Sequence, residues 1–313
     1  MTSPVATDSW IGAALARLED ERFLTGDAQF VGDLKRPGML HAAFVRSVFA
    51  HGKLLSVDAG AAHEAPGVRA VLTGDELAPL ARPFPVIAPP GADVATAAAH
   101  PVLARERVRY VGEPVALVVA DTAEQAVDAA ELVTVEIEEL PALVDAHAAE
   151  ASTLLHDSAP DNVLLRRRLG SGDVESAFAA AHTVVRNRVA APRLIAAPLE
   201  TRAVLADHDT STDLLTLWLS AQDQHRQLAG LGAVLGRGPE QLRIIVPDVG
   251  GAFGSKGVPQ AETAAVALAA LRRGRPFTWA ETRTESSLAV YQGRGLELDV
   301  ELALDEDGRI LAL

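Results

Sequence analysis

The chain has 313 residues, enough for about two domains, and 49% of them are apolar, so buried cores are expected. The 28 basic and 42 acidic residues give a net charge of −14, which disfavours nucleic acids and anionic membranes as partners. The absence of cysteine excludes disulfides, thiolate zinc sites and iron–sulfur ligation by this chain. The sequence shows neither a basic leader nor about 18 consecutive apolar residues, so we expect a cytoplasmic protein without membrane spans.

The first part of the chain is predicted to be a loose tail over residues 1–21, with one short helix, followed by an α+β block. Apolar or alternating runs predict strands at residues 40–45, 68–72, 108–111, 115–120 and 133–139. A short helix after Thr73 and a helix over residues 122–132 are also predicted. Five prolines predict a long irregular loop over residues 83–101. We expect one complete α+β domain over residues 22–145.

The second part follows an irregular connector over residues 146–170. Apolar runs predict strands at residues 184–189, 214–219, 242–246, 277–280, 296–304 and 309–313. Apolar spacing and terminal glycines predict helices at residues 172–181, 222–235 and 260–273. We expect residues 171–313 to form the first part of a second domain. The apolar strand 310–313 either pairs with 296–304 alone or is also covered by another chain.

The strongest local signal is the glycine-rich segment 250–256, Gly-Gly-Ala-Phe-Gly-Ser-Lys, between a predicted strand and a predicted helix. Glycines let backbone N–H groups approach an oxyanion, an oxo group or a phosphate closely, although such turns are also often purely structural. The segment is not a phosphate-binding P-loop, because Ser255 separates Gly254 from Lys256. The glycines at 230, 232 and 236 have the wrong spacing for a dinucleotide fingerprint.

This segment resembles the Gly-Gly-x-Phe-Gly-x-Lys element of the molybdopterin-binding large subunit in the xanthine dehydrogenase, aldehyde oxidase and carbon monoxide dehydrogenase family. Further motifs of that family match in the same order: Arg22–Gly26, Phe30–Asp33, Ala65–Val68, Val111–Ala116, Glu138–Pro141, Gly172–Val174, Pro198–Glu200, Ser220–Gln222, Gly274–Pro276 and Thr282–Glu285. The resemblance covers nearly all of residues 22–313. It implies an α+β protein with a hammerhead-like α/β domain over residues 22–145, followed by the first part of a molybdenum-cofactor-binding α+β domain.

The resemblance implies an oxidoreductase subunit that hydroxylates a small molecule, such as an aldehyde or an N-heterocycle, at a molybdenum–molybdopterin centre. It also implies a pterin dinucleotide shared with a C-terminal molybdopterin-binding chain, and partner subunits that carry iron–sulfur clusters and FAD. The candidate cofactor-binding residues are Gln222, beside an oxo ligand, and the loop residues Gly250, Gly251, Ala252, Phe253 and Gly254. An amide N–H is a suitable donor to an oxo group. Phe253 is expected to be the aromatic residue on the substrate side of the site; the alternative interpretation is that it is an ordinary core residue.

Other side chains have simpler expected roles. Lys256 is expected either to pair with a carboxylate or to be solvated. His225 lies three residues after Gln222, but a lone histidine is more often structural than a metal ligand, so no metal ligand is assigned. Arg283 and Glu285 are expected to stabilise the fold. The acidic residues of strand 133–139 are expected to be solvated.

The sequence also departs from the family in places. Gly257 stands where purine-oxidising members have an acidic residue, which disfavours a purine substrate. The family's Arg-His-Pro-like segment is replaced by Tyr291-Gln-Gly-Arg294. The family's later half carries the catalytic glutamate, so no catalytic residue is assigned within 1–313, and Glu200 is not promoted to that role. Three hypotheses follow: a split subunit whose catalytic half is a second chain, a truncated non-catalytic scaffold, or an incomplete gene product.

Overall fold

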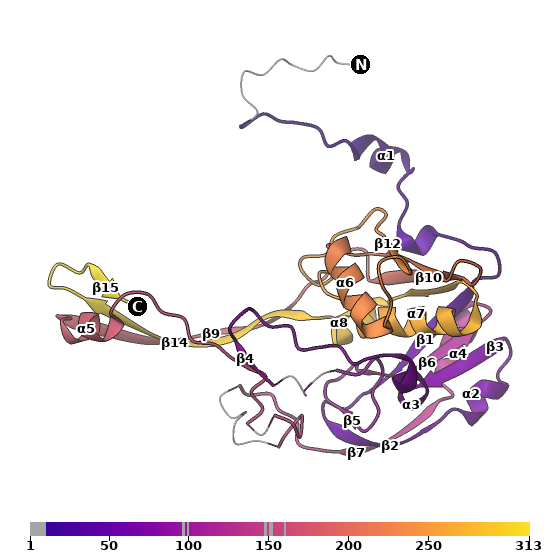
Figure 1. Ribbon diagram of the computed structural model, residues 1–313, viewed down its shortest axis with the longest axis horizontal. Helices are drawn as coiled ribbons and strands as arrows, with labels where there is room; N and C mark the ends of the chain where they lie inside the picture. The colour runs from indigo at the N-terminus through magenta and orange to yellow at the C-terminus, as the bar shows by residue number, and fades with distance from the viewer. Residues whose placement is uncertain (1–10, 96–97, 99, 147–148, 150–152, 160) are drawn as a thin grey trace.

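The computed structural model describes residues 11–313, except 96–97, 99, 147–148, 150–152 and 160 (Figure 1). Its largest sheet has the strand order β12-β11-β10-β13-β1-β6-β3. The strands are β1 (Leu40–Arg46), β3 (Val68–Thr73), β6 (Pro114–Ala120), β10 (Ala203–Asp209), β11 (Leu214–Leu219), β12 (Leu242–Ile245) and β13 (Phe277–Ala280). Strands β1 and β13 are parallel, with Leu40 opposite Phe277, so the two predicted blocks share one continuous sheet.

Strand β6 explains why helices cover both faces of this sheet. All seven of its residues are buried, as expected for a strand without a solvated face. Leu117 and Val119 belong to the core beneath α6 (Gln224–Leu235) and α7 (Ala261–Arg273), which also includes residues of both helices. The intervening Ala116 and Val118 belong to the core with α2 (Gly60–Glu64) and α4 (Ala123–Ala130). The period-two alternation of strand side chains therefore divides β6 between two cores.

Three smaller sheets complete the architecture of the described residues. Strand β2 (Gly52–Asp58) pairs with β5 (Arg107–Val108) and β7 (Thr134–Glu139). The two segments predicted to be irregular meet in a short pairing of β4 (Asp93–Val94) with β8 (Leu165–Arg166). Strands β9 (Thr183–Ile195) and β14 (Gln292–Leu304) form a long antiparallel arm that reaches away from the rest of the molecule, with α5 (Val174–Ala179) and β15 (Ile310–Ala312) near its tip (Figure 1).

The remaining described helices are short. They are α1 (Asp20–Thr25), η1 (Val31–Asp33), α3 (Gly74–Leu77), η2 (Ala78–Leu80) and α8 (Arg283–Ala289). Within the described residues, no helix is long and apolar enough to cross a membrane.

The α+β content expected from the sequence is confirmed. Two predicted helices end where expected, α6 at Gly236 and α7 at Gly274, both with left-handed backbone, whereas α4 and α5 end two residues before their predicted limits. Several predicted boundaries are wrong. The strand predicted at 108–111 ends at Val108, because the Arg109 N–H donates to the Glu113 carboxylate in a turn. The predicted strands 184–189 and 296–304 are both parts of the longer arm strands. The tail helix extends to Thr25, past the predicted boundary of the tail, while residues 1–10 lie outside the described part.

Strand β15 pairs with β14, with Ala303 opposite Ala312, which confirms the predicted hairpin. Strands β2 and β10 and helices α2 and α8 are not predicted by the sequence pattern. Strand β10 begins with buried apolar residues and ends in Asp-His-Asp, so neither an apolar run nor a regular alternation marks its full length.

Candidate functional site

The glycine-rich segment forms a loop between β12 and α7. Three of its residues have left-handed backbone: Gly251 at φ 92°, Phe253 at φ 51° and Gly254 at φ 95°. An L-residue at positive φ is uncommon, so Phe253 is held in a conformation that glycine adopts more readily. Such residues cluster at ligand sites, where the surrounding structure enforces the strained backbone.

The loop presents a run of free backbone donors. Within the described residues, the N–H groups of Gly251, Ala252, Phe253 and Gly254 have no hydrogen-bond acceptor. The chain then closes on itself: the N–H of Ser255 donates to the Ala252 carbonyl over 3.0 Å, and that of Gly257 to the Gly254 carbonyl over 3.2 Å. Successive free N–H groups in a turn of alternating backbone conformation form a concave nest that attracts anionic or oxo groups.

The Glu200 side chain holds the loop from behind. Its Oε2 atom accepts hydrogen bonds from Gly250 N over 2.8 Å, Ser220 Oγ over 2.7 Å and Lys256 Nζ over 2.9 Å. Lys256 Nζ also donates to the Glu200 carbonyl over 2.9 Å. Of the two roles considered for Lys256, pairing with a carboxylate is therefore correct, and the side chain is completely buried.

Gln222 lies beside the loop, one residue before the cap of α6. Its backbone N–H donates to the Lys256 carbonyl over 3.2 Å. Its side-chain Oε1 is 3.6 Å from the position that a Cβ on Gly257 would occupy. The residue is exposed, and the helix cap is instead Asp223, whose carboxylate accepts from the Arg226 N–H over 2.9 Å. The Gln222 side-chain amide is therefore available to a ligand at the edge of the loop.

Phe253 points away from the core. Its side chain is 79% exposed, so the alternative of an ordinary core residue is wrong. The neighbouring Ala252 is 7% exposed and anchors the middle of the loop. The predicted residue Gln222 thus contacts the end of the loop that contains Gly250–Gly254, and the exposed Phe253 ring lies within that loop.

A buried charge network lies deeper behind the loop. Arg202 donates to Glu262 over 3.0 Å, to Gln260 Oε1 over 2.8 Å, and to Glu281. Burial lowers the pKa of the Arg202 guanidinium, but the carboxylates of Glu262 and Glu281 outweigh burial and raise it. Gln260 Nε2 donates to the Ser255 carbonyl over 3.1 Å, so the network reaches the loop itself.

Sequence reasoning did not predict a role for Arg202, Glu281 or Gln260 in this support. Among the residues near Arg202 in the sequence, only Pro198-Leu199-Glu200 resembles a family motif. Arg283 donates to the Leu199 carbonyl over 3.0 Å, and Glu285 accepts from Arg46 over 2.9 Å, so both expected structural roles are confirmed.

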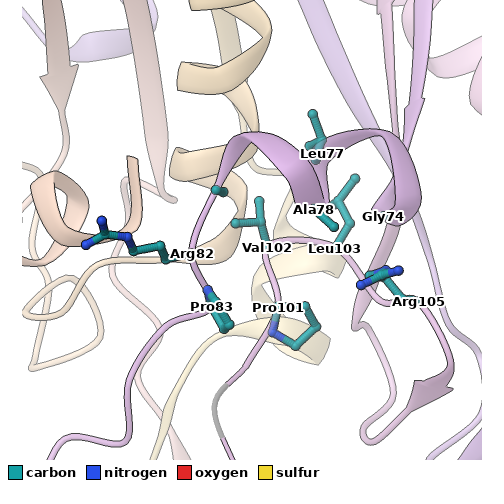
Figure 2. A pocket seen from close by; sticks show the side chains of 10 residues that line it. Gly74, Leu77, Ala78, Arg82, Pro83, Pro101, Val102, Leu103 and Arg105 are labelled. Atoms are coloured by element: carbon teal, nitrogen blue, oxygen red, sulfur yellow. The ribbon is translucent and has the colours of Figure 1, made fainter. Parts of the chain in front are cut away.

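One pocket elsewhere in the molecule shares no residues with the loop. It has a volume of about 140 Å³ and lies beside α3 and η2, between Arg82 and Arg105, with Pro83 and Pro101 at its lower side (Figure 2). Its lining is largely apolar, and Arg105 is bound to Asp75 over 2.7 Å. A cavity lined by Lys256, Gln260 and Arg202 measures only about 10 Å³, so the surroundings of Lys256 are closely packed. The described residues contain no group of three or more His, Asp or Glu side chains that could hold a metal ion.

Comparison with known proteins identifies the family. Residues 155–313 match the molybdopterin cofactor-binding domain, and residues 25–141 match the a/b hammerhead domain of aldehyde oxidase and xanthine dehydrogenase. The chain belongs to the molybdopterin-binding large-subunit family of xanthine dehydrogenase, aldehyde oxidase and carbon monoxide dehydrogenase. The expected hammerhead and molybdenum-cofactor-binding fold is thereby confirmed.

Members of this family are similar along nearly the whole chain. The nicotine 6-hydroxylase large subunit of Paenarthrobacter nicotinovorans is 37% identical over 98% of this chain and 38% of its own length. The carbon monoxide dehydrogenase large chain of Hydrogenophaga pseudoflava is 35% identical over 94% of this chain and 38% of its own length. The structure of quinoline 2-oxidoreductase from Pseudomonas putida 86 superposes with a TM-score of 0.86 at 36% identity, covering 96% of this chain and 38% of that one. The chain therefore spans about 38% of the length of these relatives.

The loop has the donors that a molybdenum–pterin group requires. Oxo and phosphate oxygens accept hydrogen bonds from N–H groups, and the loop offers four in succession beside the free amide of Gln222. A Cβ on Gly254 would meet nothing within 4 Å, so open space lies next to these donors. The residues present fit the cofactor of the family.

Proposed function

We propose that this chain supplies the glycine loop to the molybdopterin site of a molybdenum hydroxylase that acts on a small molecule. The observation that carries this proposal is that the N–H groups of Gly251–Gly254, next to Gln222, have no acceptor in the part of the chain that the structure describes. When bound, the cofactor supplies a metal centre that transfers water-derived oxygen to the substrate and accepts its electrons. The loop N–H groups would hold and orient the cofactor, and the Gln222 side-chain N–H would donate to an oxygen on it.

The substrate proposed is an N-heterocycle or a related small molecule. Relatives include enzymes named for nicotine and quinoline, both of which contain a nitrogen heterocycle. The exposed Phe253 ring is a suitable surface on which a flat heterocycle could stack. Gly257 contributes no carboxylate for a purine, in contrast to purine-oxidising members of the family.

The proposal includes partners for this chain. A separate C-terminal molybdopterin-binding chain would supply the catalytic glutamate and the remaining contacts to a pterin dinucleotide. Iron–sulfur and FAD subunits would carry the electrons away, because this chain has no cysteine with which to bind clusters. Relatives are named as a large subunit and as subunit gamma of a dehydrogenase complex, which supports a multi-subunit assembly. The same proposal divides the chain into two domains joined by a connector, at residues 22–145, 171–313 and 146–170, respectively. It also includes a cytoplasmic location.

Metal and pterin analysis of the native complex tests the proposal. The complex is purified from its host through a tag on this chain, and its molybdenum and pterin are quantified against protein. We expect both in near-stoichiometric amounts, together with a copurifying chain that bears the missing glutamate. A metal-free and pterin-free chain without a larger partner would contradict the proposal and support the non-catalytic scaffold.

A further inference from the structure

Glu200 connects three segments that are distant in the sequence. It lies between β9 and β10, while its three donors lie after β11 (Ser220), at the start of the loop (Gly250) and near the loop's end (Lys256). All three hydrogen bonds end on the same oxygen, Oε2. One carboxylate oxygen therefore fixes both ends of the glycine loop to the large sheet.

The contact between Glu200 and Gly250 sets the orientation of the first peptide of the loop. The Gly250 N–H donates to the Glu200 carboxylate over 2.8 Å, and the Glu200 N–H donates back to the Gly250 carbonyl over 3.2 Å. A Cβ on Gly250 would lie 2.6 Å from the Glu200 Cβ, so only glycine permits this approach. The Gly250 N–H therefore faces the interior, and the turn at Gly251 leaves the next four N–H groups unpaired.

Lys256 balances the charge of Glu200. Its side chain is completely buried, and burial lowers the pKa of its ammonium group, while the hydrogen bond and the charge of Glu200 oppose this shift. An unpaired carboxylate at this place would put a negative charge directly behind the N–H nest. Such a charge would weaken the attraction of the nest for an anionic group. The pair leaves the region behind the loop close to neutral.

The same geometry argues against Glu200 as the missing base. Its Oε2 atom is occupied by three donors, and its Oε1 atom is buried and has no hydrogen-bond partner among the described residues. A general base must come within hydrogen-bond reach of the proton that it removes. Neither oxygen of Glu200 is therefore both exposed and free of donors.

We propose that Glu200 and Lys256 are positioning residues that keep the N–H groups of Gly251–Gly254 directed toward the cofactor. The identity of the bound group rests on the proposed function, but the shape of the loop depends on this chain alone. The two claims can therefore fail separately. Loss of either side chain is expected to loosen the loop before it affects the rest of the fold.

Hydrogen–deuterium exchange of the native complex tests this proposal. The variants are Glu200→Gln, Lys256→Met and the double variant, and the readout is exchange in peptides covering 249–257. A hydrogen bond to a charged group contributes about 1.5–3 kcal/mol, so each single variant should speed exchange there about tenfold or more. Exchange in β6 should stay at the wild-type rate, whereas a purely structural role would raise it throughout the sheet.

The double variant gives a second readout. In Lys256→Met the buried carboxylate has lost its counter-charge, whereas Glu200→Gln/Lys256→Met has no charge at either of these two positions and keeps an amide oxygen for the Gly250 N–H. Exchange in 249–257 should therefore be slower in the double variant than in Lys256→Met. Molybdenum content of the same samples should fall in the order wild type, double variant, Lys256→Met.

The matched control changes the exposed pair Lys53–Glu138, which is separated by 3.1 Å, through Glu138→Gln and Lys53→Met. These variants should leave exchange in 249–257 unchanged. If Glu200→Gln or Lys256→Met does not fold, Ser220→Ala removes one donor of the cluster and should give a smaller increase confined to the same peptides. Wild-type exchange at 249–257 in every folded variant would overturn the positioning role. A complex without molybdenum whose loop exchange still responds would overturn only the proposed function.

Discussion

Arg46 of strand β1 and Glu262 of helix α7 form a buried ion pair, with 2.9 Å between Nη1 and Oε1. Arg202 Nη2 donates to the same Oε1 atom over 3.0 Å, and its Nη1 donates to Oε2 over 3.1 Å. Arg46 comes from the hammerhead part of the chain, and Glu262 and Arg202 from the cofactor-binding part. The shared carboxylate thus links the two parts directly behind the site, where the parallel β1–β13 pairing also joins them.

Replacing Glu262 should destabilise this junction strongly. Glu262→Gln leaves two buried arginines without their shared counter-charge, and breaking a buried pair costs about 3–5 kcal/mol. The free energy of unfolding, measured with urea, should fall by that amount. Glu301→Gln is the control, because its pair with Arg186 is exposed and should be worth less than about 1 kcal/mol. Equal losses in both variants would contradict the role of Glu262.

The acid stability of the chain should depend on the same group. Burial alone raises the pKa of Glu262, but the charges of Arg202 and Arg46 outweigh it and lower the pKa from 4.5 to about 2. A carboxylate with a lowered folded-state pKa stabilises the protein above its unfolded value and loses that contribution as the pH falls. Stability should therefore fall between pH 4.5 and about 2 in the wild type, and this part of the fall should be absent in Glu262→Gln. Parallel pH profiles for the two proteins would show that Glu262 does not titrate in this way.

The close approach at Gly250 should not tolerate a methyl group. In Gly250→Ala the new Cβ would lie 2.6 Å from the Glu200 Cβ, and overpacking of this kind costs about 1–3 kcal/mol. Thermal or urea unfolding measures the loss, and molybdenum content of the complex should fall with it. Gly170→Ala is the control, because nothing lies within 4 Å of its added Cβ. A Gly250→Ala variant as stable and as metal-rich as this control would rule out a requirement for glycine.

The cap of helix α6 should contribute separately to stability. Asp223 accepts from the Arg226 N–H, and loss of such a cap costs about 1 kcal/mol. Asp223→Ala should lower the free energy of unfolding by about that amount, while Asp223→Asn, which retains an acceptor, should lose much less. If the two substitutions have the same cost, the cap bond does not contribute.

The candidate site residues could be proposed from the sequence where they are contiguous. The segment 250–256 and the Ser-Ala-Gln step at 220–222 each resemble a family motif, and the structure places the Gln222 N–H on the Lys256 carbonyl at the end of the loop. No contiguous motif predicts the contact between Glu200 and Lys256 that holds the loop. Glu200 and Lys256 are 56 residues apart, and only the packing of the sheet brings the two side chains within 2.9 Å.

The lengths of the arm strands β9 and β14 were underestimated for a related reason. Most residues of β9 and β14 are exposed, so hydrophobic alternation is weak along them. Cross-strand pairs such as Arg188 with Asp299, at 2.8 Å, help to hold the ribbon together instead. Charge pairing of this kind depends on register, which the sequence alone does not supply.

Anomalous diffraction at the molybdenum absorption edge, recorded from crystals of the native complex, tests the central claim most directly. The account predicts one strong molybdenum peak per copy of this chain, next to the N–H groups of Gly251–Gly254 and within reach of the Gln222 amide. A peak located away from this loop, or crystals without a molybdenum signal, would contradict it.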